Sequence, residues 1–268
     1  MVRDAAAAVR AELTKIVTLR AVWLVTGAVV GLHLLLWTQN IDAETEAVDG
    51  ITADGMIERF PGTVRPAREA LAEYLAASSF QMCLFLPFTA AVIGGQEFRA
   101  GQLGASLLAV PRRGLLVGAK TLATGGFLLS AAAVIAAIST AFMYGATRGW
   151  DPGLVVSAQA WAAQAKFLAY AVLSGLVTFA VTLIARSTLA GVLVTVVLTA
   201  LTMSQVLAAF APALDALVPL SAGRNLILLP GEDLRLSAGP AHAMAVLVAW
   251  PLLATVTAAV LLTRRDAR

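Results

Sequence analysis

Charged residues are scarce in this sequence of 268 residues. They make up 13% of the chain, whereas an ordinary soluble domain contains about 25%, and apolar side chains account for 59%. A soluble fold needs a well-charged surface, so the composition argues against that class. We therefore predict an integral membrane protein.

The residues that build catalytic and metal sites are also few. The one cysteine, Cys83, excludes an intrachain disulfide, and the two histidines, His33 and His242, lie far apart in the chain. No His, Cys or carboxylate stands at metal-ligand spacing from His33, and no Gly-x-Ser-x-Gly motif occurs. We expect no catalytic residue, metal or cofactor, and we interpret His33 as a hydrogen-bonding partner of a neighbouring helix.

One segment resembles a phosphate-binding loop. Residues 114–121 read GLLVGAKT, but Ala119 stands where the motif needs its second glycine. The segment also lacks the preceding strand that would hold such a loop. We therefore expect that this chain does not bind ATP and is not an enzyme.

Long uncharged runs dominate the rest of the sequence. A bilayer core requires about 20 residues of helix, and six runs meet that length. They are residues 21–41, 74–96, 121–147, 167–185, 187–214 and 236–263. We predict an all-α membrane protein with six transmembrane helices in a single domain, residues 1–268, with a kink at Pro87 and an interruption of the sixth helix at Pro251.

The charges that flank these runs predict the orientation. Most of the 19 basic residues fall on one side of the runs and most of the 16 acidic residues on the other. Basic segments stay on the cytoplasmic side, so we expect both termini there, with residues 40–73 and 212–240 outside. Residues 212–240 are too broken to span and are predicted to be re-entrant or interfacial. The pI of 9.4 then reflects topology, and no nucleic acid partner is expected.

Two features concern contacts near the N-terminus. Residues 2–20 have the pattern of an amphipathic helix that lies along the membrane surface against lipids. Gly27 and Gly31, in the first run, have the small-xxx-small spacing that lets helices approach closely, and we predict a helix contact there.

Residues 96–120 form the longest charged passage on the predicted cytoplasmic side. Leucines recur at helical spacing before Pro111, which cannot continue a helix. The pattern predicts a short amphipathic helix. Two interpretations are open, an ordinary interfacial loop that sets topology and a contact with an energy source. The second gains weight because the six runs contain no charge that could couple transport to an ion.

Four segments together resemble the permease subunits of type-2 ATP-binding-cassette (ABC) exporters. They are AELTKIVTLRAVW at 11–23, EFRAGQL at 97–103, LLAVPRR at 107–113 and RRDA at 264–267. The resemblance covers nearly the whole chain. It implies a plasma-membrane protein, in the bacterial inner membrane, that pairs with a second permease copy and with a separate ATPase subunit.

The same resemblance implies a coupling helix between spans two and three that docks into the ATPase, with residues 2–20 as a surface helix. The implied ATPase-coupling residues are Glu97, Arg99, Gly101, Leu103, Leu107, Leu108, Pro111, Arg112 and Arg113. Gln102 stands where the family often has Thr. A non-transport membrane scaffold or a passive carrier is the alternative, and a path lined by Ala, Val and Leu would suit drugs, peptides and lipids alike.

Overall fold

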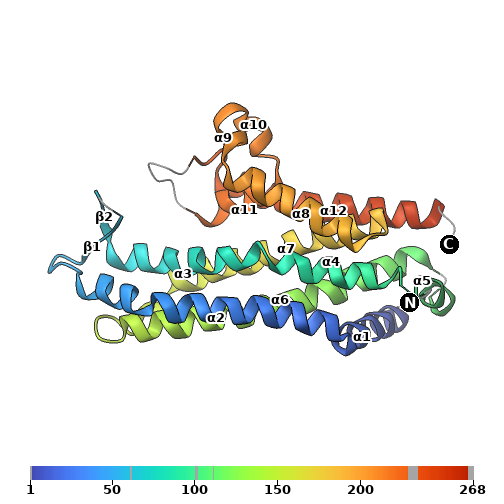
Figure 1. The fold of residues 1–268 in the computed structure, drawn as a ribbon, viewed down its shortest axis with the longest axis horizontal. Helices are drawn as coiled ribbons and strands as arrows, with labels where there is room; N and C mark the ends of the chain where they lie inside the picture. Colours follow the sequence, from blue (N-terminus) through green and yellow to red (C-terminus); the bar gives the residue numbers. More distant parts are fainter. Residues whose placement is uncertain (1, 61, 100–101, 111, 229–234, 265–268) are drawn as a thin grey trace.

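The computed structural model describes residues 2–60, 62–99, 102–110, 112–228 and 235–264. It is an all-α bundle whose long helices run side by side along one axis, with one small hairpin of strands (Figure 1). The elements in chain order are α1 (Val2–Thr18), α2 (Arg20–Asp49), β1 (Met56–Phe60), β2 (Thr63–Pro66), α3 (Ala67–Cys83), α4 (Leu86–Gln96), α5 (Gln102–Ala109), α6 (Arg113–Thr147), η1 (Leu154–Val156), α7 (Ala158–Ala185), α8 (Thr188–Met203), α9 (Val206–Phe210), α10 (Pro212–Asp215), α11 (Pro219–Ile227) and α12 (Pro240–Arg264).

Four helices in the described part of the chain are long and apolar enough to cross a membrane. These are α2, α6, α7 and α12. The central one is α7, which packs against α3, α4, α6 and α12. Outward-facing side chains on the outer helices are large and apolar, as at Leu24, Leu193 and Leu252. Lipid tails can cover such surfaces, so the fold is compatible with the predicted membrane protein.

The predicted spans at residues 74–96 and 187–214 are helical but broken. The first divides between α3 and α4, and Pro87 lies in the first turn of α4, where its missing N–H leaves no helical hydrogen bond unmade. The second contains α8, of 16 residues, which is followed by Gln205 in the left-handed conformation, with φ 53°, and then by α9. The count of six spans therefore stays a prediction.

The predicted interruption of the last run at Pro251 is wrong, because α12 continues through this residue from Pro240 to Arg264. Proline removes one backbone donor from a helix, but helices of membrane proteins tolerate this change better than soluble helices do.

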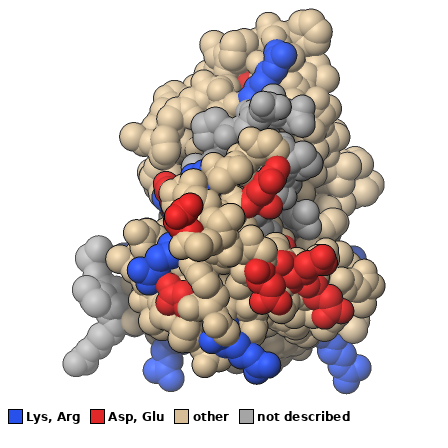
Figure 2. Space-filling view, turned by 90° about the vertical axis from the view of Figure 1, so that its left-hand side faces the viewer, with Lys and Arg blue, Asp and Glu red and all other residues tan. Residues whose placement is uncertain are grey.

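Residues 40–73 contain more regular secondary structure than the sequence predicts. The helix α2 continues to Asp49, and β1 and β2 pair antiparallel, with Gly62 at φ +81° between them. The helix α3 begins at Ala67, directly after Pro66. Figure 2 shows this end of the bundle, where acidic side chains gather on the surface.

A buried polar network holds the segment between α8 and α12. Asp215 and Arg224, with 0% and 1% of their side chains exposed, form an ion pair. The Asp215 carboxylate also accepts hydrogen bonds from the hydroxyls of Ser221 (2.7 Å) and Ser237 (2.6 Å), and Arg224 donates to the carbonyl of Thr202 (3.1 Å). Every residue of α11 is buried. As predicted, the described part of the segment is too broken to span. Its helix α11 packs inside the bundle against α7 and α12, whereas Leu214 and Leu217 are exposed.

A second polar cluster lies between α2, α3 and α6. The ring nitrogen Nε2 of His33 lies 2.9 Å from the hydroxyl of Ser139, which also accepts from the indole N–H of Trp37 (3.2 Å). The hydroxyl of Ser79 completes the cluster at 2.7 Å from that of Ser139. The interpretation of His33 as a partner of a neighbouring helix is confirmed.

Gly27 and Gly31 lie on the exposed face of α2. A Cβ added at either position would meet nothing within 4 Å in the described residues. The close helix contacts of this chain are elsewhere. A Cβ at Gly95 of α4 would lie 1.7 Å from the hydroxyl of Thr188, and Gly223 of α11 lies equally tightly against α7. A contact of Gly27 and Gly31 with a second copy stays a prediction.

Candidate functional site

The helix α5 lies within the segment predicted to be a short amphipathic helix. It connects α4 to α6 at the end of the bundle where α1 and the last turn of α12 also lie (Figure 1). Its last turn closes with a hydrogen bond from the amide of Val110 to the carbonyl of Ser106 (3.0 Å). Gly101 and Pro111, both implied as coupling residues, lie outside the described residues.

The leucines of α5 divide between two faces. Leu103 is 7% exposed and packs into the bundle, whereas Leu108 is 86% exposed. Leu107 belongs to α5, but its side chain is outside the described part of the chain. The helix therefore has an inner face, anchored by Leu103, and an outer face that carries Leu108.

Glu97 connects the end of α4 to the start of α5. Its backbone carbonyl accepts a hydrogen bond from the amide of Leu103 (2.9 Å). Its side chain is 5% exposed and turns into the bundle. The family resemblance implies that Glu97 is an ATPase-coupling residue; in the structure its carboxylate pairs with Lys15 and Lys120 of its own chain.

Four side chains form a line of alternating charge, which we call the ion-pair chain: Lys15, Glu97, Lys120 and Glu12. Lys15 pairs with Oε1 of Glu97. The Nζ of Lys120 lies 2.7 Å from Oε2 of Glu97 and 2.7 Å from Oε1 of Glu12. Lys120 is 4% exposed. The two positive and two negative groups balance, which a buried set of charges requires.

The helices bring these four residues together from distant parts of the sequence. Glu12 and Lys15 are three positions apart on α1, so they share the face that packs on α6. Lys120 projects from α6, and Glu97 follows α4. The ion-pair chain therefore fastens three segments at the α5 end of the bundle.

The basic residues around α5 have different surroundings. Arg113 donates from Nη1 to the carbonyl of Leu262 (2.6 Å), which satisfies a carbonyl in the last turn of α12. Arg99 and Arg112 are exposed beside α5. Of the implied coupling residues whose side chains are described, Leu108, Arg99 and Arg112 face outward, whereas Glu97, Leu103 and Arg113 contact their own chain.

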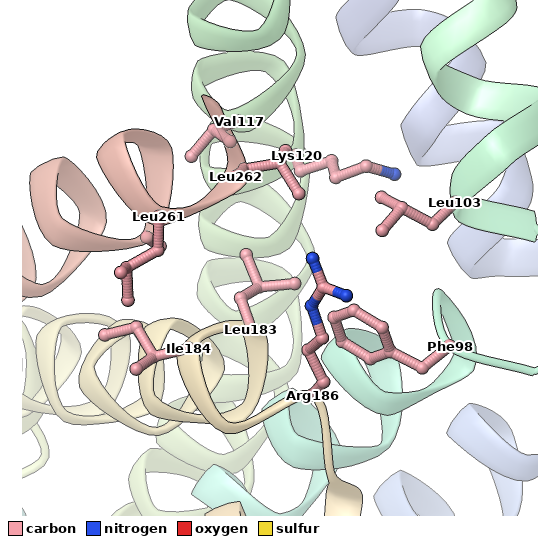
Figure 3. Close-up of a pocket in the computed structure, with 10 residues that line it drawn as sticks. Phe98, Leu103, Val117, Lys120, Leu183, Ile184, Arg186, Leu261 and Leu262 are labelled. Atoms are coloured by element: carbon pink, nitrogen blue, oxygen red, sulfur yellow. The ribbon is translucent and has the colours of Figure 1, made fainter. Parts of the chain in front are cut away.

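A small pocket lies beside the ion-pair chain, between the ends of α6, α7 and α12. Phe98, Leu103 and Arg186 extend into it with apolar residues of α7 and α12 (Figure 3). Arg186 ends α7 in the left-handed conformation, with φ 54°. The cavity volume of about 20 Å³ suits about one water molecule and leaves no room for a transported molecule.

Sequence reasoning missed most of the ion-pair chain. Lys120 was interpreted as a topological charge, and Glu12 and Lys15 as parts of a surface helix. The opposite charges of Glu12 and Lys15 at i, i+3 beside the buried Ile16 were an available signal. Residues 114–121, which resemble a phosphate-binding loop, belong to helix α6, and their lysine takes part in the ion-pair chain.

No protein-family model matches this chain, and no curated protein matches it in sequence.

Proposed function

We propose that this chain is the membrane-spanning permease subunit of a type-2 ABC exporter. In this proposal it crosses the plasma membrane six times with α1 and α5 on the cytoplasmic side, pairs with a second permease copy, and takes its energy from a separate ATPase subunit. The four long apolar helices and the four segments that resemble this family support the proposal.

The single observation that carries the proposal is the outer face of α5. Leu108 is 86% exposed at the end of the bundle, on a short helix whose other side is anchored by Leu103. A large apolar side chain presented outside the core, with Arg99 and Arg112 exposed beside it, has the composition of a protein-binding patch.

The connections of α5 suit a mechanical role. The helix lies between α4 and α6, so a partner that displaces α5 displaces the ends of two bundle helices together. ATP-driven closure of a soluble subunit has to reach the membrane helices through a contact of this kind.

Copurification of an ATPase with the tagged chain tests the proposal. We expect an ATP-hydrolysing subunit to be recovered with the unaltered chain and lost with Leu108→Asp, because a buried apolar anchor contributes about 2 kcal/mol or more to an interface. Val64→Asp is the matched control, since Val64 is an exposed apolar residue on β2, at the opposite end of the bundle. Arg112→Ala should weaken recovery less and in a salt-sensitive way.

The three variants must be compared at equal membrane expression. Full recovery of the ATPase with Leu108→Asp would remove the coupling role of α5. Failure to recover any ATPase with the unaltered chain would favour the membrane scaffold or passive carrier.

A further inference from the structure

The first turn of α5 is tied to the bundle at Leu103. Among the described side chains of α5, that of Leu103 is buried, and its amide is held by the carbonyl of Glu97, whereas Leu108 and Ala109 are exposed. A restraint on the residue that precedes so short a helix limits how its first turn can rotate about the Leu103 anchor. Glu97 is placed to supply that restraint.

Glu97 is itself held from two sides. One carboxylate oxygen pairs with Lys15 of α1, and the other lies 2.7 Å from Nζ of Lys120 on α6. Lys120 is the member of the ion-pair chain that contacts both acids, because its Nζ also lies 2.7 Å from Glu12. Removal of the Lys120 charge therefore releases Glu97 from α6 and Glu12 from its partner at the same time.

Apolar packing could join these helices at least as firmly, since a buried ion pair adds little net stability over well-packed apolar side chains. These ion pairs differ from apolar contacts in holding one particular carboxylate next to two particular ammonium groups, which come from α1 and α6. The carboxylate belongs to Glu97, whose own carbonyl holds the first turn of α5. The direction of α5 is thereby set from inside the bundle.

We propose that Lys120 is a positioning residue that acts through Glu97 to fix the orientation of α5, so that its outer face meets the ATPase already aligned. This inference rests on the proposed function of α5 as the ATPase contact. Alignment before binding lowers the ordering cost of association, so loss of the restraint weakens binding without removing any contact residue. Lys15 and Glu12 extend the same restraint to α1, which therefore moves with α5.

Three variants test this role in the full chain, reconstituted in lipid nanodiscs. Glu97→Gln and Lys120→Met each remove one charge. The double variant removes one charge of each sign, and so avoids an unpaired charge that could prevent folding; Glu12 and Lys15 remain at i, i+3 and can pair with each other. Arg10→Gln is the control, because Arg10 is exposed on α1 and lies outside the ion-pair chain.

Two quantities are measured for each variant: hydrogen exchange of the α5 amides, with α7 amides as the internal reference, and the Kd for the ATPase subunit recovered with the unaltered chain. We expect each single variant to exchange at least tenfold faster in α5 and to bind the ATPase at least tenfold more weakly, with α7 unchanged. The double variant should lose no more than either single variant, because both residues act in one restraint. Arg10→Gln should change neither quantity.

Unchanged α5 exchange in Glu97→Gln and in the double variant would overturn the positioning role, as would faster exchange with an unchanged Kd. If both α5 and α7 exchange faster, the ion-pair chain supports the whole fold and the proposal is also overturned. If the unaltered chain binds no ATPase, the proposed function fails and this inference fails with it, but the exchange measurement still tells whether Lys120 holds α5.

Discussion

The amide of Leu103 donates a hydrogen bond of 2.9 Å to the carbonyl of Glu97, the residue whose carboxylate pairs with Lys120. One residue therefore belongs both to the ion-pair chain and to the start of α5. The exposed Leu108 lies beyond this connection. The α5 end of the bundle thus combines a buried inner side at Leu103 with an exposed outer side at Leu108, which is compatible with the proposed docking role.

The buried pair of Asp215 and Arg224 should be costly to break. Asp215→Asn leaves the guanidinium buried with a neutral partner, and loss of one member of such a pair destabilises a fold by about 3–5 kcal/mol. Glu69→Gln is the control, because Glu69 is 56% exposed in its pair with Arg65 and should lose less than about 1 kcal/mol. Unfolding of both variants in the same detergent measures the difference, and equal stability would show that the buried pair is dispensable.

The contact between α11 and α7 should tolerate no added methyl group at Gly223. A Cβ there would lie 2.1 Å from the ring of Tyr170, so Gly223→Ala should destabilise the protein by about 1–3 kcal/mol through overpacking. Gly118→Ala on α6 is the matched variant, because a Cβ at Gly118 meets nothing within 4 Å. Thermal unfolding compares them, and a harmless Gly223→Ala would contradict this packing.

Gly27 and Gly31 should affect the association of two copies and not the stability of a single copy. Replacing each with Leu should leave unfolding of the monomer unchanged, because a Cβ at either position meets none of the described residues within 4 Å and both positions are exposed. The same changes should weaken self-association by on the order of 1 kcal/mol or more. Gly126→Leu, on an exposed position of α6, is the control. Dimer yields are measured by cross-linking in membranes. Equal yields from all variants would mean that the glycines face lipid.

Orientation can be tested with introduced cysteines. In a Cys83→Ser background, Val64→Cys near the acidic end should react with an impermeant maleimide in intact cells. Leu108→Cys should react after the membrane is permeabilised, since the basic segments are predicted to be cytoplasmic. Labelling of Leu108→Cys in intact cells would reverse the predicted topology.

Sequence reasoning was most successful where one pattern determines the outcome. The length of uncharged runs predicted the long helices α2, α6, α7 and α12, and the leucine spacing before Pro111 predicted a helix where α5 lies. Because no other metal-ligating residue stands near His33 in the sequence, His33 was expected to form a hydrogen bond with a neighbouring helix. In the structure its ring nitrogen lies within hydrogen-bonding distance of Ser139 on α6.

The remaining features depend on tertiary contacts that periodicity does not encode. The burial of Glu97 was not predicted, because its partners Lys15 and Lys120 come from other parts of the sequence. Tight glycine contacts occur at Gly95 and Gly223, where a neighbouring helix lies close. They do not occur at Gly27 and Gly31, although that pair in α2 has the sequence spacing typical of close helix contacts.

A photo-activated cross-linking amino acid at position 108 tests the docking role of α5 most directly. The same amino acid at position 64, on the exposed β2 strand at the other end of the bundle, is the control. The account predicts that irradiation of cells yields an adduct between position 108 and a nucleotide-binding protein, and that position 64 yields no such adduct. The absence of a nucleotide-binding protein from the adducts of position 108, in a chain that is folded and inserted, would contradict the account.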